Sequence, residues 1–264
     1  MRTLVAVVAA VMLVGAITTA VGRSQSAHPQ VTRAEYERWQ TELSNWGRWG
    51  PNDELGTLNL ITPLKRRQAA ALVKDGISVS LSSDAPKEQT VDAPCPVEWS
   101  MVSVSAGASF DRVAYPCIHG AGITHIDSFA HVFFNGKMWN GYDASRFVTK
   151  DGGALKNAVL TMKQGIVTRG VLYDIARLKG VAYLEPGTRI FVEDLEAWEK
   201  KAGASATAGD ALLLRWGRWA RRDKLGPWPI NEAMAGLDNS VIPWLKKRDI
   251  SRSEEHTSEL QSQR

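Results

Sequence analysis

The sequence contains very little cysteine. Of its 264 residues only Cys95 and Cys117 are cysteines, which excludes a small fold built on a framework of disulfides. In an oxidising compartment the two residues can form one bridge, and they can equally be two separate buried thiols. The sequence leaves this choice open.

Long hydrophobic runs are absent after the N-terminus. There, Arg2 supplies a positive charge, an apolar run covers 4–21, and small residues lie around Thr18–Gly22, as in a secretory signal peptide. We expect residues 1–22 to be a signal peptide, or a retained anchor, followed by a polar linker over 23–31. The protein is therefore expected to be exported, to the periplasm or the extracellular space, with no other membrane contact.

Charge of one sign is not concentrated in any long segment. The 32 basic and 28 acidic residues are interspersed and give a formal net charge of +4. The densest basic run consists of Arg218, Arg221, Arg222 and Lys224. This run is too short for a nucleic-acid-binding stripe, so we expect a solvated face and no nucleic-acid partner.

Hydrophobic periodicity predicts a mixed α/β domain over 32–250. Helices are expected after a capping box at Thr32 and Glu35, from Pro63 to Gly76, and over 193–202 before Gly203. The first helix should bury a stripe of three residues: Tyr36, Trp39 and Leu43. Buried strands are expected at 170–174 and 211–215, and a half-buried strand around Val102 and Val104. Strands that alternate with helices predict one sheet with flanking helices in a single domain.

The last residues, 251–264, show neither an apolar period nor turn-forming residues. They follow abruptly on 244–250, a predicted helix that leads into a strand, and they resemble the translation of a sequencing adapter. We therefore expect 251–264 to be an artefactual tail outside the fold, and the domain to be incomplete at its C-terminus.

Histidine is scarce but gathered in one place. Of the five histidines, one falls in the linker and one in the tail, namely His28 and His256. The other three lie within thirteen residues around one aspartate: His119, His125, Asp127 and His131. Histidines scattered for packing would not cluster in this way. The alternative is a surface loop whose histidines make ordinary hydrogen bonds.

The spacing of these residues favours a metal site. His125 and Asp127 share one side of an extended segment, and a helical turn would bring Asp127 and His131 to one face. Gly120 and Gly122 allow the loop to approach other backbone closely or to adopt a positive φ. Imidazoles and carboxylates bind Zn²⁺, Mn²⁺ and Fe²⁺. We therefore predict that the four residues bind a divalent metal, with Zn or Mn as the leading candidates.

Other groups near the histidines are weaker candidates for chemistry. Ser128 lacks the Gly-x-Ser-x-Gly context of a nucleophile, and nothing nearby activates Cys117. The hydroxyls of Ser128 and Thr124 are expected to orient metal ligands. Four aromatic residues flank the cluster and fit either a core or a pocket wall: Phe129, Phe133, Phe134 and Trp139.

Several motifs together resemble a known family. They are the segment Asn45–Asn59 (NWGRWGPNDELGTLN), the run from His119-Gly to His131, and the later segments Arg169–Asp174, Leu184–Gly187 and Gly236–Asp238. Over nearly all of 45–250 the chain resembles the cyclase or kynurenine-formamidase-like metal hydrolases, in their longer bacterial branch.

The resemblance implies a swivelling α/β fold, assembly into homo-oligomers, and one or two divalent metals. It makes His125 and Asp127 metal ligands, with Asp127 able to bridge two metals, and His131 a ligand of the second metal or the catalytic base. His119 precedes His125 by six residues, where the formamidases have four, and would reach the metal through a longer loop. A further histidine and glutamate in the family's last stretch are expected beyond the end of this chain.

The resemblance also implies a reaction, the hydrolysis of amide bonds by metal-activated water. The substrates would be aryl formamides, such as the N-formylkynurenine of tryptophan catabolism, or cyclic amides such as isatin. Two alternatives remain open from the sequence. One is an exported protein that binds a metal or an aromatic ligand without turnover, and the other is a cyclase that acts on a polyketide-like substrate.

Overall fold

The computed structural model describes residues 28, 30–120, 122–229 and 233–255. The chain divides into two compact units, Met1–Gln30 and Val31–Arg264, and the second contains all the elements below. The predicted signal peptide, most of the linker and residues 256–264 lie outside the described residues. Among those described, no helix is long and apolar enough to cross a membrane.

A three-stranded parallel sheet forms the centre of this unit. Its order is β5 (Gly170–Asp174), β7 (Ala211–Arg215) and β9 (Arg252–Glu255). Both predicted strands are confirmed, and they pair in register from Gly170 opposite Ala211. The backbone of Arg252–Glu255 pairs with β7 from Ala211 opposite Arg252. The expectation that the whole tail lies outside the fold is therefore wrong for these four residues, because β7 offers them an open edge.

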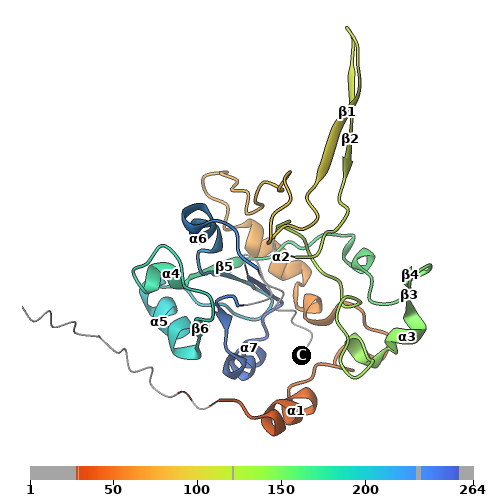
Figure 1. The fold of residues 1–264 in the computed structure, drawn as a ribbon. Coiled ribbons are helices and arrows are strands. Elements are labelled where there is room, and N and C mark those ends of the chain that lie inside the picture. The colour runs from red at the N-terminus through yellow and green to blue at the C-terminus, as the bar shows by residue number, and fades with distance from the viewer. Residues whose placement is uncertain (1–27, 29, 121, 230–232, 256–264) are drawn as a thin grey trace, which may run out of the picture. The chain divides into compact units, whose positions relative to one another are not determined.

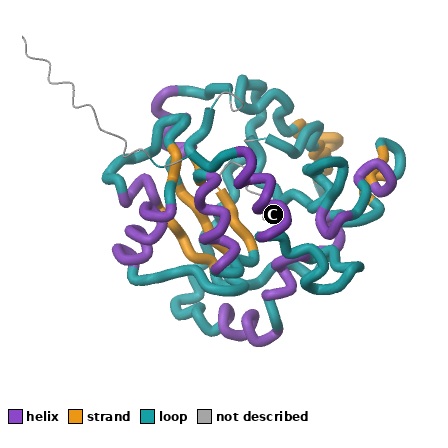
Figure 2. Tube along the Cα trace, turned by 90° about the horizontal axis from the view of Figure 1, so that it is seen from below, coloured by secondary structure: helices purple, strands orange, loops and turns teal. Residues whose placement is uncertain are grey.

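Helices cover the central strands, as Figure 2 shows. The helices that follow them along the chain are α4 (Ile175–Leu178), α5 (Val192–Ala202), α6 (Arg218–Leu225) and α7 (Ile242–Lys247). Leu195 and Trp198 of α5 join Leu212 and Leu214 of β7 in the main hydrophobic core. Trp198 also donates from Nε1 to the carbonyl oxygen of Leu172 at 2.6 Å. A mixed α/β fold is thus confirmed.

The remaining elements include a hairpin that projects from the rest of this unit (Figure 1). The helices are α1 (Arg33–Glu42), α2 (Pro63–Ala70), α3 (Ala144–Phe147), and the 3-10 turns Gly56–Leu60, Trp139–Gly141, Val159–Met162 and Asn239–Val241. The strands form three pairs: β1 (Glu98–Val104) with β2 (Ser109–Ala114), β3 (Val148–Thr149) with β4 (Gly153–Ala154), and β6 (Arg189–Ile190) with β8 (Gly236–Leu237).

Of the helix ends predicted from local sequence, two are confirmed and one is wrong. The capping box at Thr32 and Glu35 is present, and Gly203 ends α5 in the left-handed conformation with φ 67°. By contrast, α2 ends at Ala70 and not at Gly76, because Leu72 and Val73 are exposed and pack on nothing that would extend the helix.

Two burial predictions are wrong. No residue of α1 is fully buried, so its stripe is only partly covered. The half-buried strand expected around Val102 and Val104 is β1, which is exposed along its whole length. It pairs with β2 in a hairpin, and among the described residues none buries either of its faces.

Asp210 ties the start of β7 to two neighbouring segments. Its side chain is fully buried and contacts the Nζ of Lys65 at 2.5 Å and the guanidinium of Arg169 at 2.5 Å. It also accepts hydrogen bonds from the backbone N–H and the hydroxyl of Thr207. Burial alone would raise the pKa of Asp210, but Arg169, Lys65 and Thr207 outweigh it and lower the pKa to about 2.

We predict a pH-dependent stability contribution from Asp210. Its folded pKa is about 2 against an ordinary value of 3.8, so the contribution is present above about pH 4 and is lost as the pH falls toward about 2. In urea unfolding, the free-energy difference between the parent and Asp210→Asn should shrink by about 2 kcal/mol over that range. Asp151→Asn, at an exposed carboxylate, is the matched control variant and is measured in the same way. A constant difference for Asp210→Asn would contradict the prediction.

Candidate metal centre

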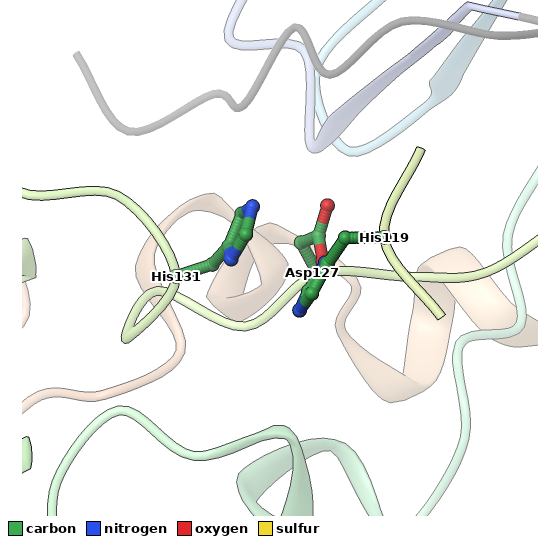
Figure 3. Close-up of side chains that lie close together, drawn as sticks. All are labelled: His119, Asp127 and His131. Carbon is green, nitrogen blue, oxygen red and sulfur yellow. The ribbon is translucent and has the colours of Figure 1, made fainter. Parts of the chain in front are cut away.

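The clustered histidines lie on an irregular segment that follows β2. The structure brings one carboxylate and two imidazoles together, with ligand atoms of His119, Asp127 and His131 all within 4.8 Å of one another. Figure 3 shows these side chains meeting although His119 comes from a different part of the loop. The sequence prediction that the three residues share one site is consistent with this geometry.

The contacts within the group are close. Nδ1 of His119 lies 2.8 Å from Oδ1 of Asp127. The rings of His119 and His131 are stacked, with 3.8 Å between their centroids and 11° between their planes. The Asp127 side chain is only 7% exposed, whereas that of His119 is 48% exposed. The carboxylate is therefore at the inner end of the site and His119 is at its rim.

His125 lies beside this group. Its Nε2 is 3.5 Å from Oδ2 of Asp127, and its ring meets that of His119 edge-on at 5.5 Å. Its Nδ1 is 2.7 Å from the carbonyl oxygen of Ile123. A carbonyl can only accept, so Nδ1 donates there and Nε2 faces the carboxylate. A backbone carbonyl that fixes an imidazole in this way is common behind metal-binding histidines.

A turn brings Asp127 and His131 together. The backbone N–H of His131 donates to the carbonyl oxygen of Ser128 at 3.1 Å, and no helix forms there. The predicted helical turn is therefore wrong, although its consequence for the two side chains holds. His125 and Asp127 share one side of a non-helical segment, as the two-residue spacing predicts.

The donor set fits a divalent cation. The contact of Asp127 Oδ1 with His119 lacks hydrogen-bond alignment, and this buried oxygen has no hydrogen-bond partner among the described residues. A desolvated carboxylate without such a partner is costly unless a positive charge compensates it. Imidazole nitrogen and carboxylate oxygen are the ligand types of Zn²⁺ and Mn²⁺. His119, Asp127 and His131 would hold the ion, with His125 adjacent.

The two loop glycines serve the two purposes expected of them. Gly120 has φ 115°, a conformation that residues with a β-carbon rarely adopt. At Gly122 an added β-carbon would lie 3.1 Å from Cβ of Ala93 and 3.2 Å from Cγ of Pro86. The loop therefore packs closely against the segment that precedes β1.

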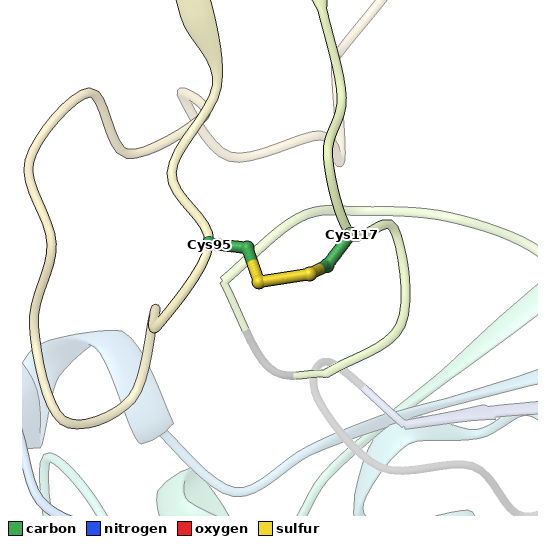
Figure 4. The surroundings of a disulfide bond; sticks show 2 residues. All are labelled: Cys95 and Cys117. Carbon is green, nitrogen blue, oxygen red and sulfur yellow. A yellow bond between two sulfur atoms is a disulfide. The ribbon is translucent and has the colours of Figure 1, made fainter.

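The choice left open for the cysteines is decided by a disulfide between Cys95 and Cys117, with 5.5 Å between the Cα atoms. Figure 4 shows that it joins the two chain segments that lead into the β1–β2 hairpin. Because its sulfur is bonded, Cys117 cannot act as a thiolate nucleophile in this form.

The hydroxyls of Thr124 and Ser128 make hydrogen bonds to backbone N–H groups of the loop and of a neighbouring segment. Thr124 Oγ1 accepts from the backbone N–H of Ser83 at 3.2 Å, and Ser128 Oγ accepts from the N–H of Ala130. Both hydroxyls therefore help to shape the loop, and their expected role in orienting metal ligands stays a prediction.

The aromatic neighbours divide between core and surface. Phe129 stacks on the buried Trp139 at 5.1 Å, and an added β-carbon at Gly56 would come within 2.8 Å of its ring. Phe129 and Trp139 are therefore packing residues. Phe133, two residues after His131, is exposed and lies on the solvent side.

A buried ion cluster behind the loop was missed in the sequence. Arg218 donates to Asp92 at 2.8 Å, both side chains are almost completely buried, and Arg222 contacts the same carboxylate at 2.7 Å. The basic run that includes Arg218 and Arg222 was predicted to be a solvated face, which is wrong for these two residues. The partner, Asp92, is more than 120 residues away in the sequence, so no local pattern could indicate the pairing.

Comparison with known proteins now adds to this geometry. The Cyclase family, described as "Putative cyclase", matches residues 65–252. The chain belongs to the Cyclase family. A solved structure described as the crystal structure of a novel cyclase shares 27% sequence identity with it, at a TM-score of 0.72. That match covers 81% of this chain and 77% of the other. No curated protein matches the chain.

The family match includes all four residues of the cluster and confirms the resemblance inferred from the motifs. It also covers the central strands β5 and β7 and the buried Arg218. The cyclase-family fold thus positions the cluster, while the identity of the ion and the reaction are matters for proposal.

We predict that metal binding depends on Asp127. Asp127→Asn keeps the shape of the side chain and removes its charge, so Zn²⁺ affinity should fall by at least about 100-fold. Competition with a chromogenic chelator measures this affinity. His28→Ala is the matched control, because it removes a histidine from outside the cluster and should leave affinity unchanged. Equal affinities of the parent and Asp127→Asn would contradict the assignment.

Proposed function

We propose that this cyclase-family protein is a metal-dependent hydrolase of aryl formamides or cyclic amides, acting on carbon–nitrogen bonds other than peptide bonds. The observation that carries the proposal is that ligand atoms of His119, His131 and the buried Asp127 all lie within 4.8 Å of one another. Zn or Mn is the proposed ion.

When bound, a divalent cation would lower the pKa of water to about 7 and would polarise a carbonyl oxygen. The buried Asp127 balances positive charge at the inner end of the site. His131 has two proposed roles, ligand of the ion or catalytic base. As the base, with its ring not bound to the ion, it would take the proton from water and pass it to the departing nitrogen, and it sits on a turn closed at Ser128. Stacking on His119 keeps the ring of His131 in one orientation.

Exposed apolar side chains beside the cluster support an aromatic substrate. Val132 and Phe133 follow His131 directly and are exposed, as is Ile118, which precedes His119. If these exposed apolar side chains border the site, they would suit a flat aryl group whose amide carbonyl reaches the imidazoles. The proposed setting is the periplasm or the extracellular space, with the protein assembled as a homo-oligomer.

Turnover of N-formylkynurenine and of isatin tests the proposal. Protein stripped with a chelator should be inactive and should regain activity with Zn²⁺ or Mn²⁺. His131→Ala should lower kcat by about 10²–10⁴-fold, and His28→Ala should match the parent.

Three outcomes would oppose the proposal. A His125→Ala or His131→Ala variant as active as the parent would refute the assigned site. Tight metal uptake without turnover of either substrate would favour a binding protein. Ring closure of an open-chain polyketide-like substrate, with no amide hydrolysis, would favour a cyclase.

A further inference from the structure

His119 needs an anchor that the rest of the cluster does not need. The backbone around Asp127 and His131 is closed by the turn at Ser128, and His125 is fixed by the carbonyl of Ile123. His119 lies outside both contacts, and about half of its side chain is exposed. Burial therefore contributes little to its position.

The hairpin that precedes His119 supplies little anchoring by packing. All residues of β1 and nearly all of β2 are exposed. The last pair of the ladder is Glu98 opposite Ala114. The cysteines stand three residues beyond it on each strand, so the Cys95–Cys117 disulfide closes the hairpin at its base, two residues before His119 (Figure 4).

The other end of the disulfide is attached to a rigid segment. Thr90 and Ala93 exchange two backbone hydrogen bonds of 3.1 Å each. Between them, Asp92 is held by Arg218 and Arg222 of α6. Cys95 is two residues beyond Ala93, so the disulfide connects the His119 segment to a turn that is held by α6.

After His119 the loop contacts the segment before β1 a second time, through packing and a hydrogen bond. Gly122 lies against Ala93 and Pro86, and Thr124 bonds to Ser83. His119 thus lies between two attached residues: Cys117, which is held by the disulfide, and Gly122, which is held by packing. Of the two, only the disulfide can be broken without changing the sequence.

We propose that the Cys95–Cys117 disulfide is the positioning element for His119, so that metal affinity depends on its oxidation state. The inference rests on the proposed metal site. It adds that the contribution of one ligand, His119, depends on whether the disulfide is oxidised or reduced. A dithiol reductant would break the S–S bond, deliver two electrons and two protons to form two thiols, and itself become a disulfide. The freed segment would then no longer hold His119 against Asp127.

The test compares Zn²⁺ affinity of the oxidised full chain, the chain reduced with a phosphine and desalted, and the Cys95→Ser/Cys117→Ser variant. The phosphine becomes its oxide, with water supplying the oxygen and both protons, and leaves no zinc-binding thiol reagent. Both altered forms should bind Zn²⁺ about 10–100-fold more weakly than the oxidised parent. The serine variant controls for zinc binding by the new thiols.

A double-mutant cycle separates positioning from a general loss of stability. Adding His119→Ala should weaken the oxidised parent to a similar extent and should have no further effect on the serine variant. In a His131→Ala background the serine substitutions should still weaken binding, because His119 is present there. Urea unfolding of each variant reports stability separately.

The outcomes are decisive. Equal affinities of the oxidised parent and the serine variant would overturn the proposal, as would an equal loss from the serine substitutions with and without His119. Absence of Zn²⁺ binding by the oxidised parent would remove the metal site itself. Zn²⁺ binding that is strong in the oxidised chain and weaker in the reduced chain, without amide turnover, would support this inference and refute only the proposed reaction.

Discussion

The site depends on the burial of the Asp127 carboxylate among imidazoles. Its side chain is 7% exposed, and one of its oxygens has no hydrogen-bond partner among the described residues. The desolvation of an ionised carboxylate is costly unless a positive charge compensates it. The gathering of three of the five histidines around this carboxylate therefore supports the proposal of a cation site.

An irregular loop can meet this requirement only if rigid neighbours hold it. On one side Phe129 stacks on Trp139, whose indole N–H donates to Asp53 at 3.0 Å. On the other side the turn at Asp92 is attached to Arg218, at the start of α6 and just after β7. No strand of the central sheet contributes a residue to the cluster of His119, His125, Asp127 and His131, and the buried contacts of Asp92 with Arg218 and Arg222 connect the segment beside it to α6.

The limits of sequence-based prediction follow from the range of each interaction. The capping box at Thr32, the helix end at Gly203 and the strand at 211–215 depend on neighbours within a few residues, and they were predicted correctly. The histidine cluster was visible because its members are close in sequence. The burial of Arg218 depends on a distant partner, and the exposure of β1 on the absence of a covering layer, and neither leaves a local signal.

The proposed export and the proposed role of the disulfide constrain each other. A disulfide persists in an oxidising compartment and is reduced in the cytosol. If His119 depends on Cys95–Cys117 for its place beside Asp127, a complete metal site requires the compartment that the N-terminal apolar run implies. The metal could then assemble with all its ligands only after export, which would keep the site weak during synthesis and strong at its destination. A loop with a half-exposed ligand is suited to this arrangement, because a fully packed histidine would not respond to one covalent bond.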